Sequence, residues 1–417
     1  MSPAVRKAAT MSIISAGILI PPAFFYYMVV KFSPNIPYND DYDAILGFLI
    51  QYLDAGGISE RLSLIFAQHN EHRIAFGKVF TVVHYYATGA IDFRVVTFFG
   101  NLSLLCITFV FFRMFRAEKE KLLLFIPVVL VFFQFQYSET IVWPMASVSN
   151  FYVLLFAFGS LLLLRGQGWG CLIAAFLLAA LSAVTQGSGL FAFPAGALLL
   201  LIKKDFGKLA AWAALSAVVL GLYFGAYVTP PHHPSITRVL FEEPLVAIRF
   251  FLTLTGASFP FPLLAGILFS MFFLLLTVRG YFKTNPVVYC CLIFAFMTTA
   301  ATSVTRSGFG IEQSLISRYR IVSVLFPVLS YMAIAELFKQ SAFKRLVFPI
   351  MLSGALVFNI VSNAVYYEYF LIYNKELRSG LLKWNYGAPA LHYPDQDRAG
   401  RILSESIKRG LYRPELE

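Results

Sequence analysis

The stretch Tyr38–Arg73, YNDDYDAILGFLIQYLDAGGISERLSLIFAQHNEHR, holds much of the polar chemistry of a chain that is otherwise apolar. It opens with an acidic cluster and closes with a run of polar residues that includes both histidines of the stretch. Of the 417 residues in the chain, 59% are hydrophobic and only 13% are charged. Because charges are so scarce, their concentration in one segment beside apolar runs indicates where the chemistry lies.

Apolar runs repeat on both sides of this stretch and decide the fold class. The mean hydropathy of +0.72 is too high for a chain that folds in water. A run of about 20 apolar residues can cross a bilayer as a helix, and these runs lack the alternation typical of barrel strands. We therefore predict an all-α polytopic membrane protein with about eleven transmembrane helices. The expected spans are residues 11–30, 93–112, 122–137, 150–164, 170–185, 190–202, 209–228, 260–278, 286–303, 321–338 and 346–366.

The spans divide the chain into one transmembrane domain, residues 1–366, and a short polar tail, residues 367–417. The large first loop, residues 31–92, contains two amphipathic segments. The first, residues 44–53, carries its apolar side chains on one face, which predicts a short helix lying in the membrane interface. The second, residues 74–90, is too polar to face lipid all round, so we expect it to pack inside the protein or lie at its surface. The adjacent prolines of the first span predict a bend or break there.

The net charge of +11 does not indicate nucleic acid, because the basic residues fall in small groups between apolar runs. This distribution is typical of short cytoplasmic loops. If Arg6 and Lys7 are cytoplasmic, the first loop and the C-terminus lie outside, which for a bacterial inner membrane means the periplasm. Neither ATP nor a nucleotide sugar is available there, and the sequence has no P-loop. The four cysteines lie in apolar runs and resemble buried hydrophobes rather than a disulfide or metal set.

The acidic cluster supplies the candidate catalytic base. Carboxylates held against a bilayer lose hydration, which raises their affinity for protons and suits Asp40 or Asp41 to take a proton from a sugar hydroxyl. Turn formation is the alternative, since Asn39 and the aspartates favour turns. Asp43 is better explained as the cap of a helix that begins at Ala44.

The polar run at the end of the stretch supplies candidate phosphate ligands. His69 or His72, together with Arg73, could hold a phosphate through charge and through the fork of guanidinium donors. A metal site is a weaker interpretation, because a His-x-x-His spacing alone has low specificity. We therefore assign no metal ligands and leave the cofactor unknown, with a divalent cation possible.

Two further residues of this run have both a functional and a structural interpretation. Glu71 could be a second acid or base, or it could pair with Lys78. Asn70 could bind substrate, or it could cap a helix that has Glu71 in its first turn.

A third polar group precedes the span at 321–338. Arg306, Arg318 and Arg320 could bind the phosphate or pyrophosphate of a lipid head group, but arginine and tyrosine also anchor proteins at this depth. Tyr319 and Trp143 could stack on sugar rings, although an aromatic belt at the membrane surface is the commoner explanation.

Taken together, these motifs resemble the GT-C class of membrane glycosyltransferases. The set Asn39-Asp40-Asp41-Tyr42-Asp43, His69-Asn70-Glu71-His72-Arg73 and Ser317-Arg318-Tyr319 is similar to a bacterial group that includes small O-antigen glucosyltransferases of serotype-converting phages. The resemblance implies a polyprenyl-phosphate sugar donor, transfer at the periplasmic face, and an inverting single displacement with Asp40 or Asp41 as base. Metal usage varies within the class, and a tail beginning at Tyr367 is short for it.

The sequence therefore predicts a glycosyltransferase that moves a hexose, with glucose as first choice, from undecaprenyl phosphate to O-antigen, lipopolysaccharide or another surface glycan. Its partners would be the donor, the acceptor, the bilayer and upstream membrane proteins that make and flip the donor, but not nucleic acid. One alternative, a flippase or transporter for lipid-linked oligosaccharide, would predict charged residues within spans and internal repeats. An O-antigen polymerase is the other alternative. The candidate residues are, for catalysis, Asp40, Asp41 and Glu71; for donor phosphate, His69, His72, Arg73, Arg318 and Arg320; and for substrate, Asn39, Asn70, Lys78, Trp143, Arg306 and Tyr319.

Overall fold

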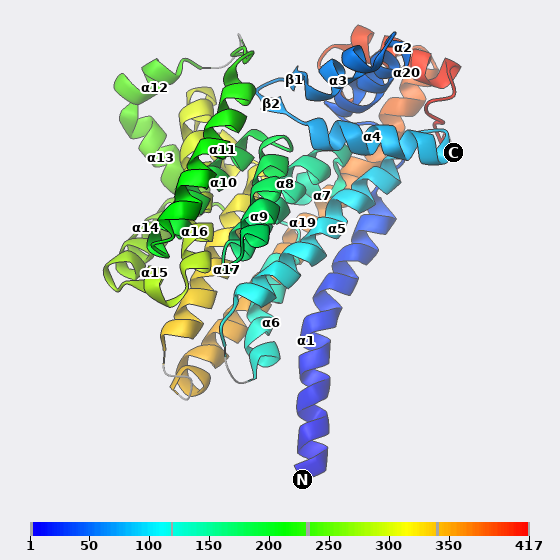
Figure 1. Cartoon of the computed structure of the whole chain (residues 1–417). Helices are drawn as coiled ribbons and strands as arrows, with labels where there is room; N and C mark the ends of the chain where they lie inside the picture. The colour runs from blue at the N-terminus through cyan, green and yellow to red at the C-terminus, as the bar shows by residue number, and fades with distance from the viewer. Residues whose placement is uncertain (1–2, 118–119, 231–233, 339–341, 416–417) are drawn as a thin grey trace.

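A computed structural model describes residues 3–117, 120–230, 234–338 and 342–415. Within these residues the chain is almost entirely helical, and its one sheet is a hairpin of two short strands. The long helices run side by side, the helices of the first loop and α20 cover one end, and α1 projects from the other (Figure 1). The all-α class is thus confirmed.

The elements are named in chain order. The first half contains α1 (Pro3–Phe32), η1 (Tyr42–Gly47), α2 (Phe48–Asp54), α3 (Ile58–Phe66), β1 (Gln68–His69), β2 (His72–Arg73), α4 (Ala75–Thr88), α5 (Phe93–Met114), α6 (Lys121–Phe132), α7 (Ser138–Val142), α8 (Pro144–Leu163), α9 (Trp169–Ala183), η2 (Gly187–Phe191) and α10 (Ala192–Ile202). The second half contains α11 (Phe206–Phe224), α12 (Ile236–Phe241), α13 (Pro244–Thr255), α14 (Pro262–Val278), α15 (Tyr281–Thr284), α16 (Pro286–Arg306), η3 (Ser307–Phe309), η4 (Ile311–Leu315), η5 (Ser317–Tyr319), α17 (Arg320–Leu337), η6 (Phe343–Val347), α19 (Phe348–Asn385) and α20 (Gln396–Lys408).

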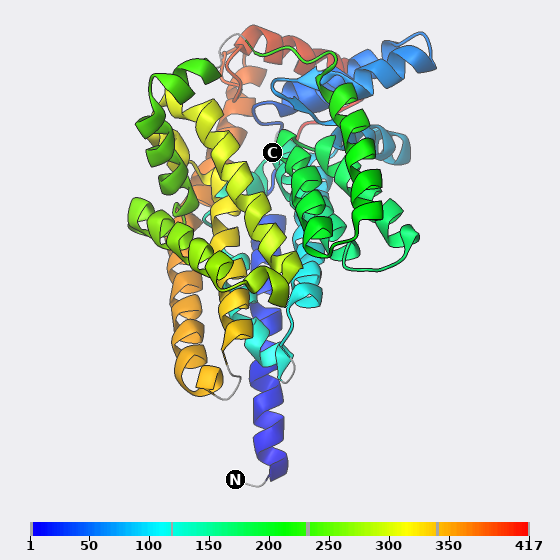
Figure 2. The ribbon, with the colours of Figure 1, turned by 60° about the vertical axis from the view of Figure 1, so that its left-hand side comes forward.

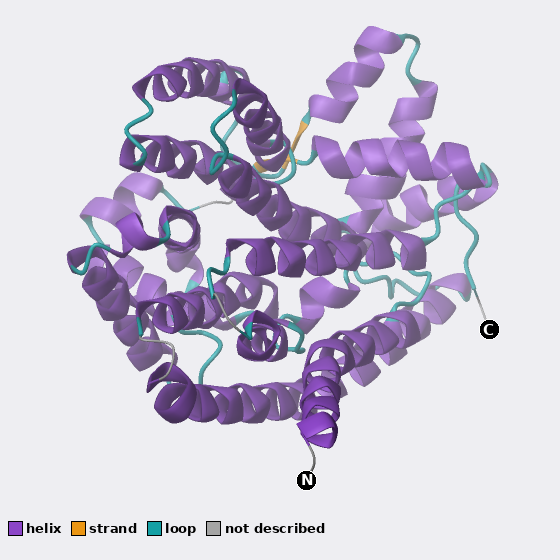
Figure 3. Cartoon of the chain, turned by 60° about the horizontal axis from the view of Figure 1, so that its bottom comes forward, coloured by secondary structure: helices purple, strands orange, loops and turns teal. Residues whose placement is uncertain are grey.

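The described residues contain seven helical stretches that are long and apolar enough to cross a membrane. These stretches are Met11–Phe32, Phe93–Met114, Pro144–Leu163, Phe206–Phe224, Pro286–Phe309, Ser317–Leu337 and Arg345–Asn385. Five shorter apolar helices of 10–17 residues accompany them. The view from the N-terminal end shows the helices gathered into one bundle (Figure 3). The structure therefore supports the membrane character expected from the hydropathy.

The helices at the two ends of the chain differ from the expected boundaries. Helix α1 continues through Pro21 and Pro22, so the prolines do not break it. Helix α19 has 38 residues and runs without interruption past residue 366, where the sequence suggested that a span ends and a tail begins. The polar residues that follow residue 366 continue the helix as far as Asn385, since no proline occurs among them and Gly380 does not interrupt it.

The helix found at the expected span 122–137 is shorter than predicted, because α6 ends at Phe132. The backbone that follows is irregular, and a polar side chain of α19 donates hydrogen bonds to two backbone carbonyl oxygens near the end of α6. The Asn359 side-chain amide donates to the carbonyl oxygens of Leu130 and Phe133, both at 2.7 Å. Irregular backbone at membrane depth is tolerated only where protein groups bond it. Asn359 thus replaces the helical hydrogen bonds that are lost where α6 stops.

The first amphipathic segment of the loop, which we predicted to turn its apolar face to the membrane interface, has that face covered by protein. It forms η1 and α2, and its apolar residues Ile45, Phe48 and Leu49 are buried inside the protein. Helix α20 covers η1, and the Ile402 side chain lies against Gly47. Protein from the end of the chain therefore provides the apolar partner that the sequence assigned to lipid.

The second amphipathic segment, residues 74–90, was expected either to pack inside the protein or to lie at its surface, and helix α4 does both. Its residues Lys78 and His84 are buried, whereas Val83 and Tyr86 are 59% and 62% exposed. The helix therefore packs one face against the protein and turns an apolar stripe outward.

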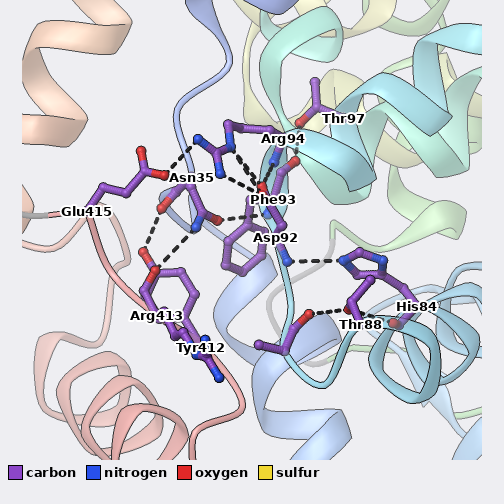
Figure 4. Close-up of polar contacts among 11 residues, drawn as sticks. Asn35, His84, Thr88, Asp92, Phe93, Arg94, Thr97, Tyr412, Arg413 and Glu415 are labelled. Carbon is purple, nitrogen blue, oxygen red and sulfur yellow. Dashed lines mark hydrogen bonds and ion pairs between the residues drawn. The ribbon is translucent and has the colours of Figure 1, made fainter.

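The C-terminal segment is docked against the first loop (Figures 2 and 4). The Tyr412 hydroxyl donates to the Asn35 carbonyl oxygen at 2.6 Å, and the Asn35 side chain donates to the Arg413 carbonyl at 3.2 Å. An ion pair of 2.7 Å joins Arg94 at the start of α5 to Glu415. The segment predicted as a tail is therefore part of the folded body.

His84 makes this docking region sensitive to pH. Its Nε2 atom accepts a hydrogen bond from the Asp92 backbone N–H at 3.1 Å, which requires a neutral ring (Figure 4). Burial lowers the pKa of His84 below its usual range, although the charge of Asp92 acts in the opposite direction. Below about pH 6.5 the unfolded chain therefore binds a proton that the folded chain does not.

We expect the stability of the wild-type chain to fall as the pH is lowered from 7.5 to 5.5, and we expect His84→Gln to reduce this fall. Glutamine keeps an acceptor for the Asp92 N–H but does not titrate. Thermal unfolding midpoints in detergent would measure both effects, with His392→Gln as the matched control. An equal loss of stability in wild type and His84→Gln would contradict the assignment.

Candidate functional site

One cavity of about 230 Å³ gathers most of the candidate residues at the end of the bundle that carries the first loop. Its walls come from the loop before η1, the β1–β2 hairpin, the start of α8, the segment before η2, the end of α16, and η5. Of the residues proposed from the sequence, it is lined by Asp40, His69, Asn70, Glu71, His72, Trp143, Arg306, Arg318 and Tyr319. These residues are far apart in the sequence, and the fold brings them together.

The hairpin presents the histidines. His69 and His72 are paired across β1 and β2, and Asn70 in the turn has a left-handed backbone with φ of 48°. His72 Nδ1 accepts a hydrogen bond from the Gly187 N–H at 3.3 Å. A Cβ at Gly187 would lie 2.8 Å from the same ring atom, so glycine is needed for this approach.

Asp40 is the carboxylate that the cavity exposes. Its side chain is 32% exposed, and its Oδ2 atom lies 3.8 Å from Nε2 of His69. That nitrogen is buried and makes no hydrogen bond within the described residues. Asp40 and His69 therefore form a loosely coupled pair that remains available to a ligand.

Asp41, the other candidate base, is fully buried and does not line the cavity. Its carboxyl accepts hydrogen bonds from the backbone N–H groups of Tyr38 and Met145, both at 2.9 Å. Burial raises the pKa of Asp41 well above its usual range, while the two N–H donors act against that rise. Since Met145 lies in the first turn of α8, Asp41 caps that helix from a distant part of the chain.

The arginines of the cavity already have acidic partners. Arg306 pairs with Glu71, which corrects the suggestion that Glu71 pairs with Lys78. Arg318 lies 3.8 Å from Glu139, a longer contact, and its guanidinium stands 5.3 Å from the centre of the Tyr319 ring. Burial raises the pKa of Glu139, and the charge of Arg318 opposes the rise.

Two predicted phosphate ligands lie outside the cavity lining. The Arg73 guanidinium donates to the carbonyl oxygen of Tyr223 at 3.1 and 3.0 Å and to that of Phe66 at 2.6 Å. Arg320 donates to the Leu315 carbonyl at 3.0 Å and contacts the Tyr366 hydroxyl. Both guanidinium groups therefore bond protein groups, and neither faces the cavity.

Two predicted substrate ligands are also placed elsewhere. The Lys78 ammonium donates to the carbonyl oxygens of Leu64 and Ala67, both at 2.9 Å. Burial, with a smaller effect from the charge of Arg73, lowers the pKa of Lys78 to about 8. Asn39 has a left-handed φ of 47°, and its backbone N–H donates to the His392 carbonyl at 2.8 Å, so it forms the turn rather than the cavity wall.

Asp43 does not cap the helix that follows it. It pairs with Arg398 of α20 at 2.8 Å and accepts a hydrogen bond from the Tyr393 hydroxyl. The third aspartate of the cluster thus fastens the C-terminal segment to the loop.

Sequence reasoning missed three polar residues of the cavity, Ser149, Asn150 and Gln186. The Gln186 amide donates to the Asn150 side-chain oxygen at 2.7 Å and accepts from the Ser188 hydroxyl at 3.0 Å. The available signal was the Gln-Gly-Ser-Gly break at residues 186–189, between the expected spans 170–185 and 190–202. Asn150 was hidden because it stands at the edge of an expected span.

An apolar groove of about 290 Å³ adjoins the polar cavity and shares seven lining residues with it, Arg306 and Arg318 among them. Its other walls are supplied by η2, α11, α16 and α17, including Phe191, Tyr223 and Val322. The combined space is therefore polar and charged at one end and mostly apolar at the other.

No three histidine, cysteine, aspartate or glutamate side chains of the described residues are grouped as a metal site would require. No known protein family matches the chain, and no curated protein is significantly similar to it.

The two neighbouring aspartates should respond differently to truncation. We expect Asp41→Ala to lower the free energy of unfolding by roughly 2–4 kcal/mol, because the N–H groups of Tyr38 and Met145 lose their buried acceptor. Asp40→Ala should lower it by less than about 1 kcal/mol. Chemical unfolding in detergent micelles would measure both values, and equal losses would contradict the division of roles.

Proposed function

We propose that this chain is a membrane glycosyltransferase of the GT-C kind, which moves a hexose from undecaprenyl phosphate to O-antigen, lipopolysaccharide or another surface glycan. The observation that carries the proposal is the cavity in which Asp40 meets two histidines and two arginines and which continues into an apolar groove. A sugar linked through phosphate to a lipid has matching parts: hydroxyl groups, an anion and a hydrocarbon chain.

In the proposed reaction Asp40 takes the proton from an acceptor hydroxyl. The hydroxyl oxygen then attacks the anomeric carbon, and the bond from that carbon to the phosphate oxygen breaks. The electron pair of the broken bond leaves with the phosphate, so the anomeric configuration inverts and no covalent enzyme intermediate forms. Asp40 suits the role because its side chain is partly exposed and is not committed to the backbone, unlike Asp41.

Arginine would stabilise the phosphate that leaves. The guanidinium of Arg318 has five N–H donors, and its contact with Glu139 is long, so donors remain for phosphate oxygens. Arg306 would exchange part of its contact with Glu71 for the phosphate. Positive charge placed where the leaving group gains negative charge lowers the barrier for this step.

The remaining cavity residues would orient the sugar. Trp143 and Tyr319 offer aromatic surfaces, and the linked amides of Asn150 and Gln186 offer a donor and an acceptor for hydroxyl groups. Their separation along the chain means that sugar binding would depend on the assembled bundle.

We also propose that eleven helical passes cross a bacterial inner membrane, with the N-terminus cytoplasmic and the C-terminus periplasmic. The seven long stretches would be joined by α6, α9, α10 and the α13–α14 pair as the remaining passes. Helices shorter than about 20 residues can serve in this way where protein rather than lipid surrounds them. Donor synthesis and flipping would then be carried out by other membrane proteins upstream.

Asp40→Asn should abolish sugar transfer, with a loss of at least about 10²-fold, because an amide cannot accept the proton. Structural analysis of the surface polysaccharide from cells that express each variant would measure transfer. The control is Glu60→Gln, an acid-to-amide change on exposed α3, which should transfer normally. Full transfer by Asp40→Asn would refute the proposed base, and a polysaccharide that never gains a sugar, even with wild type, would refute the transferase.

Fusion reporters test the orientation. An alkaline phosphatase joined to the C-terminus should be active, because this enzyme needs the periplasm to fold. A green fluorescent reporter at the N-terminus should fluoresce from the cytoplasmic side. An inactive phosphatase at the C-terminus, with the protein present in the membrane, would overturn the proposed topology.

A further inference from the structure

An open groove of about 800 Å³ lies between the end of α19 and helix α20. We propose that this groove binds the acceptor polysaccharide as a segment of several sugar residues, away from the reacting hydroxyl. The identity of the ligand as acceptor rests on the proposed function. The groove itself is separate from the catalytic cavity, with which it shares no lining residue.

Trp384 forms one wall, and a glycine opposite makes room for it. The indole is half-buried at the end of α19. A Cβ at Gly400 would lie only 3.2 Å from the indole Nε1 atom, so any larger residue there would crowd the ring. An aromatic ring beside an open polar surface is the kind of platform on which the apolar face of a sugar can rest.

The opposite wall carries polar side chains at helical spacing. Asp397, Arg401, Ser404 and Lys408 follow one another by three or four residues along α20, so they project along one side of it. None of the four side chains has a hydrogen bond or ion pair within the described part of the chain. A row of donors and acceptors is thus open to a ligand.

The chemistry of the groove favours a glycan over other ligands. Its acidic residues, Asp397 and Glu405, balance Arg401 and Lys408, so it has no excess charge for a strong anion. Interspersed donors and acceptors match the hydroxyl groups of a sugar chain, whereas a lipid tail would leave them without partners. The volume lies near the top of the range of about 300–1,000 Å³ seen for ligand sites, which suits more than one sugar ring.

The position of the groove suits an acceptor. Arg398 of α20 pairs with Asp43 at 2.8 Å, only three residues along the chain from Asp40. Helix α20 and the first loop cover the same end of the bundle (Figure 2). A long polysaccharide held here would therefore have its further residues at the face where the catalytic cavity lies.

Binding and kinetics of the purified full-length chain would test this proposal. The probe is delipidated surface polysaccharide from a strain that carries the chain, titrated by microscale thermophoresis. Trp384→Ala and Gly400→Leu should each weaken binding by about threefold to tenfold, as expected when one aromatic contact is lost or blocked. Tyr386→Ala is the matched control, because this neighbouring aromatic is 86% exposed and lies outside the groove. Its affinity should stay within about twofold of wild type.

In transfer assays, Trp384→Ala should raise KM for the polysaccharide and leave kcat and KM for a single-repeat acceptor unchanged. Wild-type affinity in both groove variants, or no binding by wild type, would overturn the groove as a glycan site. If Trp384→Ala does not fold, the pair Asp397→Asn and Ser404→Ala gives the same test from the other wall. If the groove variants lose binding but the wild type transfers no sugar, the transferase is refuted and the glycan site is kept. If the wild type transfers sugar but Trp384→Ala has an unchanged KM for the polysaccharide, the glycan site is refuted and the transferase is kept.

Discussion

The buried carboxyl of Asp41 joins the first loop to the N-terminus of α8, and the cavity depends on this joint. One of its oxygens accepts from the loop at Tyr38 and the other from the helix at Met145. Each of these N–H groups would otherwise be buried without a partner, which costs about 1–3 kcal/mol per group. The joint therefore fixes where Asp40 stands relative to Trp143 and the arginines. Because Asp41 supplies the acceptor for both N–H groups, the Asp40 side chain can stay partly exposed at the cavity wall.

The arginines, like the two aspartates, divide into those at the cavity wall and those that bond the backbone. Arg306 and Arg318 contact acidic side chains at the cavity wall, whereas Arg73 and Arg320 donate to backbone carbonyls. A ligand can replace a carboxylate partner by offering another anion. Moving Arg73 would leave the carbonyl oxygens of Tyr223 and Phe66 without their donor. An arginine with a carboxylate partner can therefore exchange it for an anionic ligand, whereas an arginine that bonds backbone carbonyls stabilises the fold.

Sequence reasoning predicted the helical membrane class and most of the cavity residues, because both follow from simple constraints. Apolar runs of sufficient length must become helices, and the polar residues of alternate connections come to the same end of the bundle. It could not separate Asp40 from Asp41 or Arg318 from Arg320, since adjacent residues of one type differ only in what the fold places beside them. It also assigned residues 44–53 to the membrane interface, because the apolar face that covers them belongs to α20, at the other end of the chain.

The docked C-terminal segment explains how a first loop of mixed charge can hold a fixed shape. A loop that is anchored only by spans would expose the apolar side of η1 and the carboxyl of Asp43. Helix α20 buries the first and pairs the second with Arg398, and the contact of Tyr412 with Asn35 closes the arrangement near the start of α5. The side of α20 that lines the groove carries polar groups and faces Trp384 at the end of α19. One short helix therefore both holds the shape of the first loop and presents a polar surface to solvent, so changes to its two faces should affect stability differently.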